Sequence, residues 1–263
     1  MLVDTHCHLD FNSFDLDRQE VIHRARETGV GRILNPGIDL NSSQEAIRLS
    51  EHYPEVYSAV GVHPNEAITW DESSLRDLRR LAEKSKVVAI GEIGLDYYRD
   101  RAPKDLQKQV FLEQLALAGE LNLPVIVHNR QANEDILSIL KDWIVQLKVS
   151  GSLLAGRPGV LHSFSGDVGF AALAIQSNFF LGFTGTVTFN NALELQEVVQ
   201  AIPADRILIE TDAPFLTPHP NRGKRNEPAN VYWVAKKIAG LRMIGEDDLI
   251  NQTASNAARL FCW

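Results

Sequence analysis

Cysteine is scarce in this chain: the only two, Cys7 and Cys262, lie near opposite ends of a 263-residue sequence. This scarcity argues against a disulfide framework and is typical of a reducing cytoplasm, where we expect the protein to reside. Long apolar runs are absent too, since none approaches the roughly 20 residues that cross a bilayer. Asp4 and His6 interrupt the first apolar residues, so we expect no signal peptide and no membrane association.

An excess of positive charge is also missing. The chain has 26 lysines and arginines against 34 aspartates and glutamates, for a net charge of −8. Proteins that hold duplex nucleic acid by electrostatic attraction usually have the opposite sign. An enzyme whose bound cations reverse the local field is not excluded. With 44% hydrophobic and 23% charged residues, the composition is that of an ordinary globular protein.

Short apolar, β-branched segments alternate with helical patterns along the chain. Strands are expected at residues 2–6, 31–35, 56–62, 87–91, 125–128, 159–162, 179–183 and 207–210. Helices are expected at residues 17–28, 42–52, 71–83, 104–121, 134–147, 168–176, 192–200, 229–239 and 246–261. Alternating strands and helices favour a parallel sheet. Eight such units match the size of an α/β TIM (β/α)8 barrel, so we predict a single domain over residues 1–263.

The alternative fold is a doubly wound open sheet. It would more naturally carry a glycine-rich phosphate loop after the first strand, and "HCHLDFNSF" is not one. No stretch is long enough to mark a domain boundary. Residues 148–158, "KVSGSLLAGRP", are expected to form a surface loop. Its two adjacent leucines could be ordinary loop packing or a small contact patch.

Ionisable side chains gather where the expected strands end. On an extended segment His6 and His8 point to one face and Cys7 to the other. Each such residue alone has an ordinary structural explanation, such as a buried histidine or a turn aspartate. In a TIM barrel, however, the carboxyl ends of all strands meet at one rim. Five of the eight histidines and two carboxylates lie at such ends: His6, His8, His63, Glu92, His128, His162 and Asp212.

A ring of imidazoles and carboxylates indicates a divalent-metal site. One catalytic zinc normally takes three protein ligands. Six candidate ligands instead suggest two ions that share a bridging carboxylate. Imidazole and carboxylate donors suit Zn²⁺, Mn²⁺ and, less obviously, Mg²⁺. The six are His6, His8, Glu92, His128, His162 and Asp212.

Several motifs occur in the order typical of one family: "HCH", "GVHP", "GEIGLDYY", "PVIVHNR", "LHSFSG", "ETDAP", "GKRNEP" and "NAARLF". With these the chain resembles the TatD family of metal-dependent deoxyribonucleases, in the amidohydrolase-like superfamily of TIM barrels. The resemblance implies divalent-metal-dependent cleavage of DNA phosphodiesters, typically from a 3′ end. It also places the family's metal ligands on the same six residues. The chain departs from the family at Asn65, where a second histidine is common, and at "HNR", which keeps Arg130. The 148–158 connection is longer than usual.

The two-metal hypothesis gives each residue a role. We expect His6, His8 and Asp212 to hold one ion and His128 and His162 the other. Glu92 bridges the two ions, and Asp212 also accepts a proton from the attacking water. The expected catalytic residues are Asp212, Glu92 and His63.

Substrate contacts are expected outside this ligand set. His63 is assigned to a substrate phosphate or the leaving group, and Arg130 offers a bidentate fork for phosphate. Lys224 and Arg225 either follow a single-stranded backbone or form a solvated basic loop. Tyr97 and Tyr98 could stack on a base or pack in the core. Glu210 and Glu227 are expected to support the site.

Two other functions compete with a nuclease. One is an amidohydrolase-type enzyme for a small amide, ester or phosphoester. Many of those place a carboxylated lysine at the end of the fourth strand, where this chain has Glu92 and no lysine. The other is a catalytically silent binding barrel, which should have lost ligands that this chain retains. We therefore expect a monomeric enzyme that trims the 3′ ends of single-stranded DNA.

Overall fold

The computed structural model describes residues 1–99 and 101–263, in which eight strands form one parallel sheet in the order β1 to β8. Every neighbouring pair is parallel, as the hydrogen-bonded registers show. The predicted TIM barrel is therefore confirmed. The strands are β1 (Leu2–Asp4), β2 (Val30–Pro36), β3 (Val56–Val60), β4 (Val87–Asp96), β5 (Val125–Arg130), β6 (Gly159–Leu161), β7 (Phe180–Phe183) and β8 (Ile207–Ile209).

The ring closes between the last and the first strand, largely just beyond their ends. The Thr5 N–H donates to the Ile209 carbonyl at 3.2 Å. Farther along, the Asp212 N–H donates to the carbonyl of His6 at 2.8 Å, and Cys7 forms a parallel bridge with Ala213. These bonds bring the segment after β1 against the segment after β8. Backbone hydrogen bonds thus hold two of the expected ligand segments side by side.

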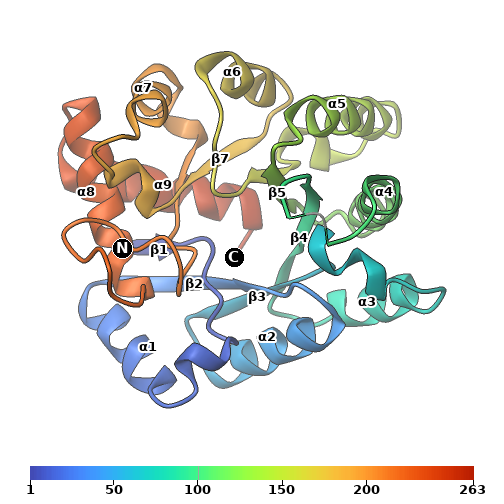
Figure 1. Ribbon diagram of the computed structural model, residues 1–263, viewed down its shortest axis with the longest axis horizontal. Helices are drawn as coiled ribbons and strands as arrows, with labels where there is room; N and C mark the ends of the chain where they lie inside the picture. The colour runs from blue at the N-terminus through green and yellow to red at the C-terminus, as the bar shows by residue number, and fades with distance from the viewer. Residues whose placement is uncertain (100) are drawn as a thin grey trace.

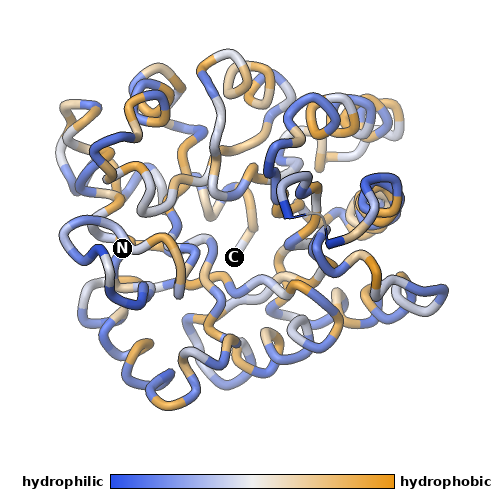
Figure 2. Tube along the Cα trace, viewed as in Figure 1, coloured by the Kyte–Doolittle hydropathy of each residue, from blue (hydrophilic) through white to orange (hydrophobic). Residues whose placement is uncertain are grey.

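Helices surround the strands on the outside (Figure 1). Many of them alternate hydrophilic and hydrophobic residues along their length, as expected of helices that pack one face on a sheet (Figure 2). Within the described chain none of them is long and apolar enough to cross a membrane. The helices are α1 (Arg18–Glu27), α2 (Leu40–His52), α3 (Ser74–Ala82), α4 (Lys104–Leu121), α5 (Asn133–Val149), α6 (Val168–Gln176), α7 (Leu193–Ala201), α8 (Val231–Arg242) and α9 (Glu246–Phe261).

The barrel interior has its own apolar core at the end opposite to the site. Side chains of the strands, such as Val3, Leu34 and Phe180, pack there against Leu260 and Phe261 of α9. Figure 1 shows α9 behind the ring of strands, with the C-terminus near the centre of the ring. A second, larger cluster fills the space between strands and outer helices.

Some element boundaries differ from the expected ones. β1 ends at Asp4, where the Thr5 N–H donates to Ile209 of β8 instead of to β2, although the Cys7 N–H donates to Leu34 of β2 again. β4 runs beyond the expected residue 91 to Asp96, because it keeps pairing with β5. Gly94, at φ 140°, allows this pairing, since a Cβ there would lie 2.0 Å from a β5 carbonyl oxygen.

The 148–158 segment is less irregular than expected. α5 continues to Val149, and a 3-10 helix occupies Leu153–Gly156. Of the two adjacent leucines, Leu154 is fully buried and Leu153 is exposed. Leu154 is thus an ordinary packed loop residue, whereas Leu153 is not packed.

Candidate metal centre

The strand-end side chains meet in a cavity of about 700 Å³ at the carboxyl end of the barrel. Glu92 lies on β4 and His128 on β5, while the others follow their strands directly. His6 and Glu92 are almost completely buried, and Asp212 is partly open to the cavity. The structure therefore brings together side chains that are more than 200 residues apart in sequence.

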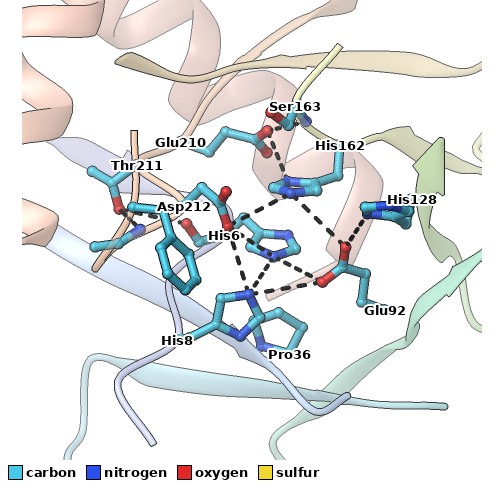
Figure 3. A network of polar contacts seen from close by, with 12 residues as sticks. His6, His8, Pro36, Glu92, His128, His162, Ser163, Glu210, Thr211 and Asp212 are labelled. Atoms are coloured by element: carbon cyan, nitrogen blue, oxygen red, sulfur yellow. Dashed lines mark hydrogen bonds and ion pairs between the residues drawn. The ribbon is translucent and has the colours of Figure 1, made fainter. Parts of the chain in front are cut away.

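One group forms around the segments after β1 and β8. The Nε2 atoms of His6 and His8 lie 3.2 Å apart and point to the same place. Asp212 Oδ1 is 3.8 Å from His6 Nε2 and 3.6 Å from His8 Nε2. Glu92 Oε2 lies 3.4 Å and 3.7 Å from the same two nitrogens. Two imidazoles and two carboxylates thus face a common centre (Figure 3).

A second group forms around the other oxygen of Glu92. Oε1 lies 2.8 Å from His128 Nδ1 and 4.0 Å from His162 Nε2. His63 Nε2 is 3.6 Å from the same oxygen. In Figure 3 the Glu92 carboxylate lies between His128 on one side and the His6–His8 pair on the other. Its two oxygens therefore face different histidines, and His162, whose ring stacks on that of His6 with centroids 3.4 Å apart, also shares a metal-like group with His6 and Glu92.

The spacing of these atoms fits a metal ion better than direct hydrogen bonding. Donors about 2.0–2.2 Å from a tetrahedral ion lie about 3.3–3.6 Å from one another. The distances around His6, His8, Glu92 and Asp212 fall close to this range, and 3.4–3.8 Å is long for charge-assisted hydrogen bonds. Among the residues that the structure describes, none accepts or donates a hydrogen bond at the buried Nδ1 atoms of His6 and His8. Cys7 is fully buried and takes no part in these metal-like groups of the described residues.

The electrostatics keep the carboxylates ionised. Burial alone would raise the pKa of Glu92, but His63, His6 and His128 together hold that pKa well below its usual range. Burial likewise opposes ionisation of Asp212, but the bond from His8 and the charges of His162 and His6 lower its pKa. Burial lowers the pKa of His63 to about 3. Although burial disfavours their charged forms, the neighbouring carboxylates raise the pKa values of His8 and His128, so cation binding would release protons from these two rings.

Sequence comparison identifies the family to which this arrangement belongs. The family model described as "TatD related DNase" matches residues 3–262. The chain belongs to the TatD-related DNase family. A Bacillus subtilis relative, named as the metal-dependent hydrolase YabD, is 48% identical over 261 residues and is covered to 99%, as is this chain. The resemblance inferred from the motifs is therefore confirmed, and with it the assignment to the metal-dependent hydrolases.

Other TatD relatives agree along their whole length. A 3′-5′ ssDNA/RNA exonuclease TatD from Erwinia tasmaniensis is 40% identical over 266 residues, with 99% of each chain covered. The crystal structure of the TatD homologue YJJV from Escherichia coli superposes with a TM-score of 0.91 at 32% identity. That superposition covers 100% of this chain and 98% of the other.

A buried carboxylate holds His162 of this TatD chain in place. Glu210 Oε1 lies 2.9 Å from His162 Nδ1 and accepts the Ser163 N–H at 2.5 Å. Burial alone would lower the pKa of His162, but the charge of Glu210 raises it to about 10. Gly182 on β7 makes room for this carboxylate, because a Cβ there would lie 2.4–2.7 Å from its oxygens. The supporting role expected for Glu210 is consistent with these contacts.

Asp96 was not among the residues singled out from the sequence, and the structure places it beside the second group. It is 1% exposed, and its Oδ2 lies 3.3 Å from His128 Nε2. The same oxygen accepts a hydrogen bond from Asn65 at 3.2 Å. A signal existed in the sequence, since Glu92, Gly94 and Asp96 alternate along one face of an extended strand. It was missed because the strand was expected to end at residue 91.

Asp4 connects the two backbone segments that carry His6 and Asp212. Its Oδ2 accepts the Thr211 hydroxyl at 2.6 Å, and its Oδ1 accepts the N–H groups of Thr211 at 2.9 Å and His6 at 3.3 Å. The carboxyl is fully buried, and burial raises its pKa to about 8. These bonds also fix Thr211, next to Asp212, whose φ of 55° lies in a region that aspartate tolerates.

The expected substrate residues divide into two sets. Arg130 and His63 line the cavity. Lys224 and Arg225 are exposed and do not line it, and the Arg225 guanidinium pairs with Asp17 at 2.6 and 2.8 Å.

The remaining supporting and aromatic residues also lie apart from the metal groups. Glu227 pairs with Arg24 on the outside of the barrel. Tyr97 donates its hydroxyl to Asp135 at 2.5 Å. Tyr98 is exposed, and Arg130 Cζ lies 4.0 Å above its ring.

Proposed function

We propose that this TatD enzyme is a two-metal phosphodiesterase that removes nucleotides from the 3′ end of single-stranded DNA. The proposal rests on the position of the Glu92 carboxylate, whose two oxygens face different histidines. Its Oε2 faces His6 and His8. Its Oε1 faces His128, His63 and His162. A carboxylate so placed suits a bridge between two cations. The name of the Erwinia relative supports the choice of substrate and of direction.

His6, His8 and Asp212 would hold one divalent ion, and His128 and His162 the other. Ions bound by these residues would supply positive charge for a phosphodiester and would lower the pKa of a bound water. The mixed nitrogen and oxygen donors fit Zn²⁺ or Mn²⁺, and Mg²⁺ less well. We thus propose both the number of ions, two, and their identity, Zn²⁺ or Mn²⁺.

Asp212 is the proposed proton acceptor. Its Oδ1 faces the imidazoles of His6, His8 and His162. The side chain is 15% exposed and lines the cavity, so the carboxylate can also reach a water there. Its lowered pKa keeps it in the basic form.

His63 is proposed to donate a hydrogen bond to a phosphate oxygen. Its Nδ1 accepts the Asn65 N–H at 3.0 Å, which places the proton of the neutral ring on Nε2. Nε2 faces the centre near Glu92 Oε1. With a pKa of about 3, His63 carries little of the protonated form near neutral pH, so we favour phosphate binding over protonation of the leaving group.

The shape and charge of the site favour the end of a strand over a duplex. The centre lies in a half-open cavity of about 700 Å³, and the chain has a net charge of −8. Arginine side chains at the cavity are few: Arg99, Arg101 and Arg130. One strand end can enter such a cavity while its other phosphates stay in solvent.

The proposal is tested with end-labelled oligonucleotides and chelator-treated protein to which single divalent ions are returned. Linear single strands, blunt duplexes and circular single strands serve as substrates. We expect a ladder that shortens from the 3′ end on linear single strands and no cleavage of circles. Cleavage of circles would contradict an exonuclease. Hydrolysis of small esters without any action on oligonucleotides would favour an amidohydrolase-type activity instead.

A further inference from the structure

Aromatic rings lead from the metal centre to the surface on one side of the cavity. The ring of His8 stacks on Phe11, with centroids 4.6 Å apart and planes at 21°. Phe11 in turn meets Phe215 edge to face at 5.9 Å. Phe215 is 52% exposed. A large apolar ring is thus open to solvent next to a candidate ligand.

The main chain around Phe215 is fixed, although its ring is exposed. Its N–H donates to the Asp212 carbonyl at 2.8 Å, and its carbonyl accepts from Asn226 Nδ2 at 2.6 Å. Asn226 is fully buried and also donates to the Thr211 carbonyl. The ring is therefore carried by the same turn that carries Asp212, so its position is tied to the reacting centre.

The two sides of the cavity differ in charge. The side after β1 and β8 presents Phe11, Phe215 and Leu216, and among the described residues it contributes no lysine or arginine to the lining. Arg130, by contrast, comes from β5. A nucleotide has the same two-sided character, since its phosphate is anionic and its base is a planar, largely apolar ring. Phosphates suit the arginine side, and a base suits the phenylalanine side.

We propose that Phe215 stacks on the base of the 3′-terminal nucleotide while the rest of the strand leaves along the Arg130 side. This assignment rests on the nuclease function proposed above and specifies its substrate contact. Every base has a π face, so stacking tolerates sequence but requires a base. Tyr98, the other exposed aromatic near the mouth, does not line the cavity, and Arg130 covers one face of its ring.

The test combines a change in the protein with a change in the substrate, as in a double-mutant cycle, and measures whether the two effects are coupled. Wild-type enzyme and Phe215→Leu are each assayed, fully metal-loaded, on a normal oligonucleotide and on one whose last nucleotide lacks its base. We expect the missing base to lower kcat/KM of the wild type about tenfold. The same change should alter kcat/KM of Phe215→Leu less than twofold. Phe215→Trp should keep the wild-type response, and Tyr98→Leu, across the mouth, should keep it too.

Each outcome decides a separate point. Equal sensitivity of wild type and Phe215→Leu to the missing base would overturn the stacking role while leaving the nuclease proposal intact. Coupling to the penultimate base instead of the last would overturn the assignment to the terminal nucleotide. Absence of any oligonucleotide hydrolysis by the wild type would overturn both proposals. Metal content and melting temperature of Phe215→Leu should match the wild type, because the replaced ring is half exposed.

Discussion

The carboxylate of Asp96 lies 3.3 Å from Nε2 of His128. On the opposite side of the ring, Nδ1 of His128 is 2.8 Å from Glu92. The imidazole is therefore held between two carboxylates, one in the metal-like cluster and one behind it. Burial would raise the pKa of Asp96, but the bond with His128 and the N–H groups of Arg99 and Tyr98 lower it. An ionised Asp96 fixes the orientation of His128.

Replacing Asp96 should therefore weaken metal binding. We expect Asp96→Asn to lose about 10–100-fold in affinity for the ion proposed to bind at His128, as is typical when the carboxylate behind a metal-binding histidine is removed. Titration of chelator-treated protein with Mn²⁺ or Zn²⁺, followed by calorimetry, measures this. Asp142→Asn is the matched control, because Asp142 is exposed on α5. Unchanged affinity in Asp96→Asn would show that His128 needs no such support.

The fold, the strand-end residues and the supporting role of Glu210 could be expected from local patterns, whereas supports that depend on distant contacts could not. Each of His6, Glu92 and His128 follows a short apolar segment directly in the sequence. Such local patterns predict both the strands of the barrel and the residues at its rim. Asp96 requires knowing how far β4 pairs with β5, which is a contact between distant segments. Arg225 looked like a free basic residue because its partner, Asp17, lies 208 residues earlier.

Gly182 offers a second example of a support invisible in sequence. A Cβ at this position would meet both oxygens of Glu210, which is buried and pairs with His162. We expect Gly182→Ala to lower the stability of the protein by about 1–3 kcal/mol through overpacking. It should also weaken metal binding, because Glu210 must shift. Thermal unfolding with and without metal measures both effects. Gly240→Ala, on α8 with open space around the added methyl, should be neutral or stabilising.

Asp212→Asn should retain the fold but lose most hydrolysis. The amide is a poor proton acceptor, and loss of a general base typically costs about 10²–10⁴-fold in rate. Single-turnover assays on a labelled single strand, with metal content verified in each sample, give the comparison. Asp205→Asn, at the opposite end of β8, serves as the control because its side chain is half exposed. A metal-loaded Asp212→Asn enzyme with wild-type turnover would require a different base.

Removing metal should lower thermal stability. Binding to the folded chain alone contributes about 2.7 kcal/mol when the free ion is at 100 times its dissociation constant. For a protein of this size we expect a fall in melting temperature of about 5–10 °C on chelation. Excess Mn²⁺ or Zn²⁺ should restore it. The double variant His6→Ala/His8→Ala should show a much smaller response to chelator, because it lacks two of the proposed donors. An equal response would place the bound metal elsewhere.

Substrate binding should depend shallowly on salt, with a loss of no more than about 16-fold in affinity between 50 and 200 mM. The arginines that line the cavity are Arg99, Arg101 and Arg130. Arg101 Nη1 is also 3.9 Å from Glu66, which competes for its charge. For single strands the slope of log K against log salt is about −0.7 for each phosphate neutralised, so three contacts give a slope no steeper than about −2. Fluorescence anisotropy with a labelled oligonucleotide between 50 and 200 mM salt measures this slope in the metal-loaded Asp212→Asn variant, where hydrolysis is slow.

Two variants test which basic residues contact the strand. Arg130→Gln should make the slope shallower by about 0.7, whereas Lys224→Gln should leave the slope unchanged if only the cavity engages DNA. A slope of −4 or steeper would mean that the strand lies across a longer basic surface, and a change with Lys224→Gln would place part of that surface in the loop after β8.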